Sequence, residues 1–309
     1  MKIAIIGTGG VGGYFGAKMA QAGCNVTFLA RGAHLEAIKR NGIKVKSILG
    51  DFHLDNVRAV STIPEMGMVD LAIVSVKAWQ VKDIRADLKL ILHPNAIVLP
   101  LQNGIMAAQE LGEVIDPKRV IGGLCRIISK IESPGVIAHL GVTPTIVFGD
   151  FNGELSQRVK QLKALFDKAD FSSRVSDDIE ADMWKKFISI CVSGLLAVSK
   201  TTYGEIRKLD ETRALMIGLI KEVYELSQRK GLKIAPDFID RTVSFIDSFP
   251  PDTSSSLTRD VLEGKPSEIE YQNGTVVRLG QELGVSTPIN RFVYSCILPM
   301  ELRARHGKV

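Results

Sequence analysis

The sequence has no long apolar run. Its strongly apolar stretches, such as Leu71 to Val76, are far shorter than the ~18 residues that a membrane-spanning helix needs. Met1 and Lys2 lead directly into a strand-like pattern, without the charged and apolar segments of a secretory signal peptide. We therefore expect a cytoplasmic protein that does not associate with membranes.

Cysteine is scarce, and close cysteine pairs are missing. The cysteines are Cys24, Cys125, Cys191 and Cys296. This scatter excludes the paired spacing of a zinc site and the density of a disulfide framework. We expect buried thiols and no bound metal.

Long runs of one charge are also missing. The chain has 39 basic and 34 acidic residues, a net charge of +5. Because the basic residues are spread among acids, a nucleic-acid partner is not expected. A modest positive field suits a small anionic substrate or a phosphate-rich cofactor.

What the chain does contain is ordinary globular composition over 309 residues, with 45% apolar and 24% charged residues. This composition argues against a disordered or collagen-like chain. The length is about twice the ~150 residues of an average domain, so we expect two domains.

In the first half, short β-branched runs alternate with helical patterns. The expected strands are Ile3–Ile6, Val26–Leu29, Leu71–Val76, Ala96–Leu99 and Thr145–Phe148, and the expected helices are 11–22, 33–40, 79–90, 105–112 and 154–168. Because the strands are apolar on both faces, the pattern predicts a mostly parallel sheet covered by helices, of the doubly wound α/β class.

The second half has a different texture. Long apolar patterns of period 3.6 predict helices over 177–199, 206–230, 235–249 and 268–283, with almost no strand candidates between them. The polar run Asp170–Ser173 interrupts the apolar pattern. We therefore predict an α/β domain over residues 1–172 and an all-helical domain over residues 173–309.

A glycine-rich turn follows the first strand and opens a helix. It reads Gly7-Thr8-Gly9-Gly10-Val11-Gly12. Gly7 permits a tight turn, Gly9 lets the backbone approach a pyrophosphate, and Gly12 lets helix and strand pack closely. The helix N-terminus then offers N–H groups to the anion. This position in a βαβ unit predicts dinucleotide binding.

An arginine follows the second expected strand. Sites for NAD usually place Asp or Glu there, whereas sites for NADP place a cation for the 2′-phosphate. Arg31 can form a bidentate pair with that phosphate and stack on the adenine. The alternative is a solvated loop arginine; we favour NADP.

Two polar blocks follow later strands. In a doubly wound sheet, ligands lie outside the carboxyl ends of the strands. Lys77 follows the strand Leu71–Val76, and Gln102-Asn103-Gly104 follows the next strand. Each alone is more typical of a cap or turn, but both at one sheet edge favour a ligand site, where the amide of Asn103 can donate and accept.

Candidate acid and base residues occur in the helical half. In Trp184-Lys185-Lys186-Phe187, one lysine can face solvent while the other, about 100° round the helix, turns inward. An inward lysine beside apolar walls is prepared to give up a proton. Glu268, which follows Ser256, could hydrogen-bond a substrate hydroxyl. From spacing alone, a solvated charged helix face is the simpler explanation of these residues.

Taken together, these blocks resemble the ketopantoate reductase (2-dehydropantoate 2-reductase) family over nearly the whole chain. The blocks are Gly7–Gly12, Arg31, Val76–Gln80, Gln102–Gly104, Trp184–Lys186, Ser256, Glu268–Glu270 and Asn273–Gly274. The resemblance implies a Rossmann-type N-terminal domain, a helical C-terminal domain like that of 6-phosphogluconate dehydrogenase, and an active site in the cleft between them.

The resemblance also implies an activity and roles for residues. The activity would be NADPH-dependent reduction of ketopantoate to (R)-pantoate, in the biosynthesis of pantothenate and coenzyme A. Lys186 would be the general acid, with Glu268 as its catalytic partner. Asn103, Ser256 and Glu268 would hold the substrate beside Lys186. The cofactor would contact Gly7, Thr8, Gly9, Gly10, Val11, Gly12, Arg31, Lys77 and Asn103.

The chain departs from the family pattern at two positions. The family usually carries two asparagines after the lysine, as in Lys-x-x-x-Asn-x-x-x-Asn-Pro, whereas this chain has Ile190 and Gly194 there. Ser189 and Ser193 are one residue out of register. Loss of polar groups from a pocket wall loosens or redirects specificity.

Three hypotheses follow. The first is ketopantoate reduction, the second is reduction of a different, more apolar 2-oxo acid, and the third is a non-catalytic NADP(H)-binding sensor. Lys186 and Glu268 argue against the sensor. The expected partner is a small-molecule 2-oxo acid, and a homodimer remains an open alternative.

Overall fold

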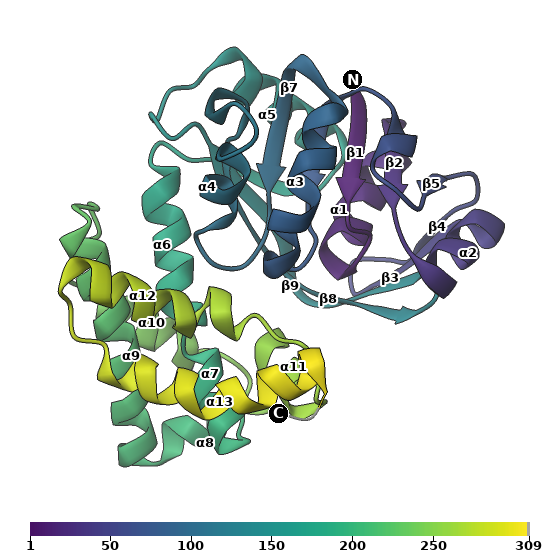
Figure 1. The fold of residues 1–309 in the computed structure, drawn as a ribbon. Helices are drawn as coiled ribbons and strands as arrows, with labels where there is room; N and C mark the ends of the chain where they lie inside the picture. The colour runs from purple at the N-terminus through teal and green to yellow at the C-terminus, as the bar shows by residue number, and fades with distance from the viewer. Residues whose placement is uncertain (308–309) are drawn as a thin grey trace. The chain divides into compact units, whose positions relative to one another are not determined.

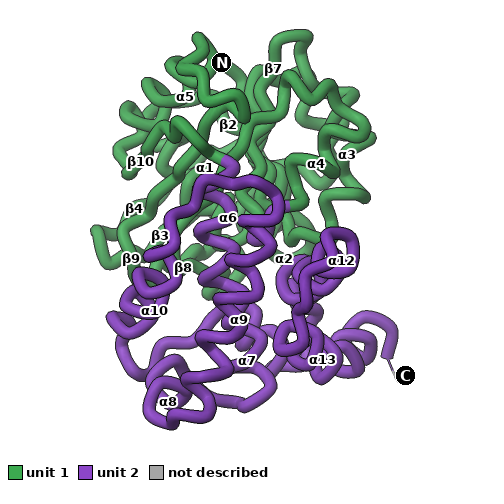
Figure 2. The backbone as a smooth tube through the Cα atoms, turned by 90° about the vertical axis from the view of Figure 1, so that its left-hand side faces the viewer, with its two compact units in different colours: residues 1–102, 106–179 green, residues 103–105, 180–309 purple. Residues whose placement is uncertain are grey.

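The described residues form two compact units. The structure is a computed structural model that describes residues 1–307. Unit 1 comprises Met1–Gln102 and Met106–Ile179, and unit 2 comprises Asn103–Ile105 and the described chain from Glu180 onward (Figure 2). The division lies after Ile179, seven residues beyond the predicted boundary at residue 172, because Ser172–Val175 belong to a sheet of unit 1.

Unit 1 contains a parallel sheet of strand order β5-β2-β1-β6-β7. Figure 1 labels β1, β2, β5 and β7 of this sheet. Its strands are β1 (Lys2–Ile6), β2 (Asn25–Leu29), β5 (Arg58–Val60), β6 (Val69–Val74) and β7 (Leu92–Pro100). The sequence predicted β1, β2, β6 and β7, with ends that differ from those observed. It did not predict β5.

Successive residues of this sheet point to opposite faces, as a period of two requires. On one face, Ile3 and Ile5 belong to the buried core that includes Phe15 of helix α1 (Gly10–Gln21). On the other face, Ala4 and Ile6 belong to the core that includes residues of α3 (Val81–Leu90) and α4 (Ala107–Gly112). Helices therefore cover both faces, which makes this a doubly wound, Rossmann-type sheet.

A second sheet of unit 1 was not predicted. Its strands are β3 (Ile43–Ser47), β4 (Phe52–Leu54), β8 (Gly122–Ser133), β9 (Val136–Gly149) and β10 (Ser172–Val175). The predicted strand Thr145–Phe148 is the end of β9, and β8 and β9 form a long antiparallel hairpin. Pro134-Gly135 at its turn, where Gly135 has φ +78°, is a sequence signal that could have revealed the hairpin.

Helix α1 packs against both sheets through glycines. A Cβ on Gly12 would lie 2.2 Å from the carbonyl oxygen of Gly7, and a Cβ on Gly10 would lie 2.6 Å from the carbonyl oxygen of Ser129 in β8. Side chains at these positions would push the helix away from the strands. The remaining helical segments of unit 1 are α2 (Gly32–Asn41), η1 (Pro64–Met66), η2 (Ala78–Gln80), η3 (Pro117–Arg119) and α5 (Gln157–Lys168).

Unit 2 is helical in its described part. Its elements are α6 (Ile179–Ile190, whose first residue belongs to unit 1), α7 (Ser193–Ser199), α8 (Tyr203–Lys208), α9 (Asp210–Arg229), α10 (Phe238–Asp247), α11 (Ser256–Leu262), η4 (Ile269–Tyr271), α12 (Asn273–Leu283) and α13 (Pro288–His306). Three of the four predicted helical stretches are interrupted, and the fourth, 235–249, is the shorter helix α10. Helices α11 and α13 lie outside the predicted stretches. The core gathers buried residues from α6, α7, α9 and α13.

Across residues 1–307, no helix combines the length and apolar character needed to cross a membrane. The four cysteines are thiols: Cys125 and Cys191 are buried, as expected, whereas Cys24 and Cys296 are half-buried.

Candidate functional site

The glycine turn adopts the geometry predicted for a phosphate-binding loop. Gly7 has φ +104°, and a Cβ there would lie 2.8 Å from the backbone nitrogen of Val76, so only glycine fits. Gly9 is the N-cap of α1, and apart from Gly9 and its two chain neighbours no atom of the described residues lies within 4 Å of the position of a Cβ on it. The turn is therefore closed against the sheet at Gly7 and Gly12 but open at Gly9. This open space at a helix N-terminus fits a diphosphate.

A histidine that sequence reasoning missed holds this turn. His34 Nδ1 accepts a hydrogen bond from the backbone N–H of Gly135 at 3.0 Å, so Nε2 carries the proton and donates to the carbonyl oxygen of Thr8 at 2.9 Å. Thr8 also donates through Oγ1 to the carbonyl of Leu29. Burial lowers the pKa of His34, although the hydrogen bond to Thr8 opposes the shift. The neutral ring links α2, the glycine turn and the β8–β9 hairpin.

Arg31 lies where the cofactor argument needs it. It is the exposed N-cap of α2 and follows β2 in the sequence after one residue. β2 is the neighbour of β1, whose end leads into the glycine turn. A cation at this place fits a phosphate on the ribose, and the assignment to NADP rather than NAD remains a prediction.

The carboxyl ends of β6 and β7 carry the next predicted residues. Lys77 is half-buried, and its Nζ lies 5.8 Å from the centre of the Trp79 ring. Gln102 is 7% exposed, and its Nε2 donates to the carbonyl of Val76 at 3.1 Å, which ties the two strand ends together. Among residues 1–307, Gln102 Oε1 is a buried oxygen without a hydrogen-bond partner. This orphaned acceptor at the ligand edge of the sheet fits a bound amide or hydroxyl donor.

In unit 2 the structure brings Asn103 and Glu268 together. Asn103 Nδ2 donates to Glu268 Oε2 at 3.0 Å, and Glu268 is 5% exposed. The loop that carries Asn103 packs on η4: a Cβ on Gly104, which has φ +92°, would lie 2.7 Å from the carbonyl oxygen of Tyr271. Two residues chosen separately from the sequence thus form one polar pair.

The adjacent lysines of α6 have different surroundings. Lys185 forms an ion pair with Asp182 at 3.2 Å, one helical turn earlier. Lys186 is half-buried, and its carbonyl accepts a hydrogen bond from Ser189. The catalytic role of Lys186 stays a prediction.

The surroundings of Ser256 and Ser189 give less support for a role in substrate binding. Ser256 is exposed at the first position of α11, whereas its neighbour Ser255 is the N-cap that accepts from the backbone of Thr258. Ser189 is committed to a carbonyl of its own helix. The substrate-binding role of Ser256 stays a prediction.

The two departures from the family pattern have different environments. Ile190 is half-buried and packs against the unit 2 core. Gly194 is buried in α7, and a Cβ there would lie 2.6 Å from Asn273 Oδ1 and 2.5 Å from Val293 Cγ1. Position 194 therefore faces the packed interior, which corrects the expectation that both positions have lost polar groups from a pocket wall. The substrate question rests on Ile190.

Asn273 occupies the space beside Gly194. Its Nδ2 donates to the carbonyl of Cys191 at 2.9 Å and to Asn290 Oδ1 at 2.8 Å. The first bond satisfies a carbonyl at the break between α6 and α7, which the apolar pattern had not predicted.

Burial raises the pKa of the Cys191 thiol well above its usual value, so this thiol stays protonated.

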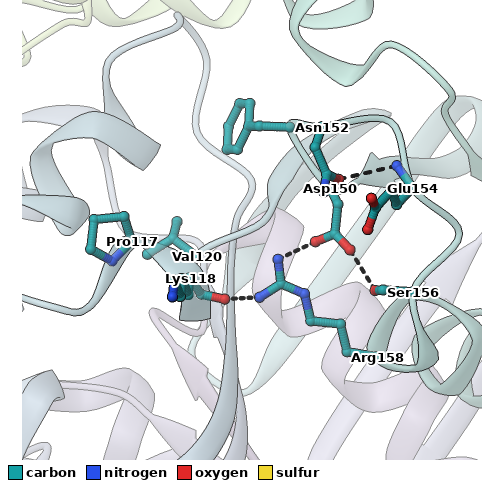
Figure 3. Close-up of a pocket in the computed structure, with 9 residues that line it drawn as sticks. Pro117, Lys118, Val120, Asp150, Asn152, Glu154, Ser156 and Arg158 are labelled. Atoms are coloured by element: carbon teal, nitrogen blue, oxygen red, sulfur yellow. Dashed lines mark hydrogen bonds and ion pairs between the residues drawn. The ribbon is translucent and has the colours of Figure 1, made fainter.

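A surface pocket of about 370 Å³ in unit 1 lies apart from the predicted site residues (Figure 3). Arg158 at its centre bonds to the buried carboxylate of Asp150 and to the carbonyl of Lys118. Asp150 also accepts from Ser156, the N-cap of α5. These contacts join the end of β9 to α5, so the cluster has a structural explanation.

The chain matches two family models. Residues 3–153 match the family model described as "Ketopantoate reductase PanE/ApbA", and residues 178–301 match the model described as "Ketopantoate reductase PanE/ApbA C terminal". A 2-dehydropantoate 2-reductase of Nostoc sp. is 31% identical, with 100% of this chain and 98% of that protein covered. A Bacillus subtilis protein named "Uncharacterized oxidoreductase YkpB" is 28% identical over 96% of this chain and 97% of its own.

Solved structures with a similar fold include a member of the same family. The crystal structure of 2-dehydropantoate 2-reductase from Geobacter metallireducens is 31% identical and covers 96% of this chain and 99% of its own, with a TM-score of 0.90. A ternary structure of D-mandelate dehydrogenase with NADH and anilino(oxo)acetate also has a TM-score of 0.90, with 99% of this chain and 100% of that chain covered. At 22% identity, that second likeness shows the fold alone.

Proposed function

The chain belongs to the ketopantoate reductase family of oxidoreductases, and from this membership we propose that it reduces the C2 carbonyl of a 2-oxo acid with NADPH. The proposed substrate is 2-dehydropantoate and the product (R)-pantoate, in pantothenate and coenzyme A biosynthesis. The Asn103–Glu268 pair carries the proposal, because it assembles two predicted substrate residues in one partly buried polar contact.

The cofactor half of the proposal rests on the edge of the parallel sheet. The open space at Gly9 would take the diphosphate, and Arg31 would pair with the 2′-phosphate. Lys77 adds a positive charge at the end of β6. When bound, NADPH supplies the hydride for the reduction.

The substrate half rests on unit 2. Lys186 would donate a proton to the oxygen of the C2 carbonyl as that oxygen gains negative charge, which spares the reaction a free alkoxide. Asn103 and Glu268 would orient the acid, the amide as donor and the carboxylate as acceptor from a substrate hydroxyl. Ser256 would contribute a further hydroxyl contact. The partner in this proposal is a small molecule, and the cytoplasmic location and the homodimer remain predictions.

A second candidate function is the reduction of a different, more apolar 2-oxo acid. Ile190 favours it, because an apolar side chain stands where the family pattern has an amide. An amide in a pocket discriminates strongly for a substrate hydroxyl, and its loss relaxes that discrimination.

The test is an NADPH-oxidation assay with 2-dehydropantoate and with branched, straight-chain and aromatic 2-oxo acids at equal concentration. The highest kcat/KM with 2-dehydropantoate supports the first function, and a clearly higher value with another acid supports the second. Lys186→Ala should lower kcat by roughly 10²–10⁴-fold while NADPH binding is retained. NADPH binding without oxidation of NADPH by any acid would instead indicate a sensor.

A further inference from the structure

The segment that carries Glu268 is held by the C-terminal helix α13. Ser267, the residue before Glu268, is 0% exposed. Its backbone N–H and its hydroxyl both donate to Glu301 Oε2, at 2.8 and 2.6 Å. Its carbonyl accepts from Arg305 Nη2 at 3.1 Å. Every polar group of this serine is therefore bonded to Glu301 or Arg305.

Glu301 and Arg305 are themselves locked to each other. Arg305 Nε lies 2.6 Å from Glu301 Oε1, one helical turn apart on α13, and the Glu301 side chain is 5% exposed. A buried carboxylate is costly unless it is paired and hydrogen-bonded. Here Ser267 supplies two hydrogen bonds to Oε2, and the ion pair with Arg305 lies at Oε1. Pro299 lies inside α13, just before this pair.

The residues after Glu268 are held as well. Glu270 bonds to Arg278 of α12 and accepts from the hydroxyl of Tyr294 at 2.6 Å. Burial and the bond to Glu270 raise the pKa of Tyr294 to about 12, so the hydroxyl remains a donor at neutral pH. The carbonyl of Glu268 accepts from the backbone N–H groups of Tyr271 and Gln272. Glu268 thus sits between two anchored residues.

We propose that Glu301 and Arg305 are positioning residues that set the place of the Glu268 carboxylate through Ser267. The inference rests on the proposed function, in which Glu268 binds the substrate. A backbone fixed on both sides of Glu268 keeps its carboxylate at the amide of Asn103 and lowers the entropy lost when substrate binds. The two residues touch neither substrate nor cofactor in this scheme.

The first test is kinetic. Glu301→Gln keeps the size of the side chain but removes the charge that Ser267 and Arg305 share. Its KM for the 2-oxo acid should rise about tenfold, with the affinity for NADPH unchanged, because a hydrogen bond to a charged group has been weakened. In a Glu268→Ala background the same substitution should have little further effect on kcat/KM, since its action passes through Glu268.

The matched control is Asp247→Asn. It removes another charged partner in unit 2, the carboxylate that receives two bonds from Arg213 at 2.9 and 2.7 Å. This variant should keep the wild-type KM. If Glu301→Gln does not fold, Ser267→Ala, which removes one donor and leaves the ion pair, carries the same test.

The second test does not depend on activity. In protein labelled with ¹⁵N-asparagine, the side-chain amide signal of Asn103 is the one that disappears in Asn103→Ala. That signal should shift in Glu301→Gln and in Ser267→Ala but not in Asp247→Asn. A lower melting temperature with an unchanged KM and an unchanged Asn103 signal would overturn the proposal. If wild type turns over no 2-oxo acid, the proposed function fails, while the amide signal still decides whether Glu301 positions Glu268.

Discussion

Asn103 Nδ2 donates a hydrogen bond to Glu268 Oε2 at 3.0 Å and so joins two positions 165 residues apart in the sequence. Asn103 directly follows Gln102, where the first segment of unit 1 ends, yet it belongs to unit 2, and its loop packs on η4. The loop that follows β7 therefore carries a side chain that belongs to unit 2. The amide and the carboxylate should behave as one functional group.

This coupling gives the first prediction. Asn103→Ala and Glu268→Ala should each lower kcat/KM for the 2-oxo acid by roughly 5- to 150-fold, since each removes the hydrogen bond between the amide and the carboxylate at a cost of about 1–3 kcal/mol. The double variant should be no worse than the poorer single variant by more than a few-fold. Steady-state kinetics of the three variants completes the cycle. Full additivity of the two losses would show that the residues act independently.

The glycine turn gives the second prediction, because Gly9 and Gly12 differ in their surroundings. Gly9→Ala should keep the melting temperature but weaken NADPH binding, since the added methyl enters the open space proposed for the diphosphate. Gly12→Ala should lower both, because its Cβ would lie 2.1 Å from Ser75 Oγ. Thermal unfolding and fluorescence titration with NADPH separate the two outcomes. Unchanged NADPH affinity in Gly9→Ala would contradict the proposal that the diphosphate binds in the open space at Gly9.

Arg31 gives the third prediction, on cofactor choice. Arg31→Glu should reverse the preference from NADPH to NADH, because a carboxylate repels the 2′-phosphate and can accept from the ribose hydroxyls. The check is kcat/KM for both cofactors in wild type and variant. Lys39→Glu, which changes the charge of an exposed residue at the far end of α2, is the matched control and should keep the wild-type preference. If Arg31→Glu still prefers NADPH, Arg31 does not bind the 2′-phosphate.

The fold of unit 1 could be predicted where a single apolar run encodes an element. Strands such as β1 and β6 are buried on both faces, and their residues are apolar except for Lys2 and Asp70 near the strand starts. The second sheet lacked this signal: β3 reads Ile43-Lys-Val-Lys-Ser47 with alternating burial, and β8 and β9 carry exposed polar residues. Such half-buried strands are recognised by their partners rather than by composition.

The site could be predicted as far as its motifs reach. Gly7–Gly12, Arg31 and Asn103 each follow a strand, and their places come from local sequence alone. The hydrogen bonds that hold these residues in place could not be predicted, because they join residues far apart in the sequence. His34 bonds to Gly135, 101 residues away, and Ser267 bonds to Glu301, 34 residues away. Gly194 shows the reverse error: a family pattern suggested a pocket position, whereas packing against Asn273 places it in the interior.

The environment of Gly194 gives the fourth prediction. Gly194→Ala should lower the free energy of unfolding by roughly 1–3 kcal/mol, because overpacking outweighs the better helix propensity of alanine. The control is Gly112→Ala in α4, whose Cβ would meet Pro117 at an ordinary 3.7 Å and should be neutral or stabilising. Urea unfolding measures both. If Gly194→Ala were as stable as wild type, the neighbouring Val293 and Asn273 would have to move easily, and the interior placement would lose its support.

The fifth prediction concerns pH. Burial holds the pKa of His34 below the ordinary value of about 6.5, and the ring must be neutral to accept from Gly135. The unfolded chain therefore binds this proton more readily than the folded chain. The contribution of His34 to stability is fully present above about pH 6.5 and is lost as the pH falls from there towards the lower pKa of the folded state.

The measurement is the free energy of unfolding in urea at pH 7.5, 6.5 and 5.5. Carboxylates titrate in wild type and in every variant, so the effect of His34 is measured as the difference between two curves of unfolding free energy against pH. His34→Gln should be less stable than wild type at pH 7.5, and the gap should narrow towards pH 5.5. Parallel curves for His34→Gln and wild type would mean that the proton of His34 is not linked to folding, and the neutral ring would no longer explain how the glycine turn is held.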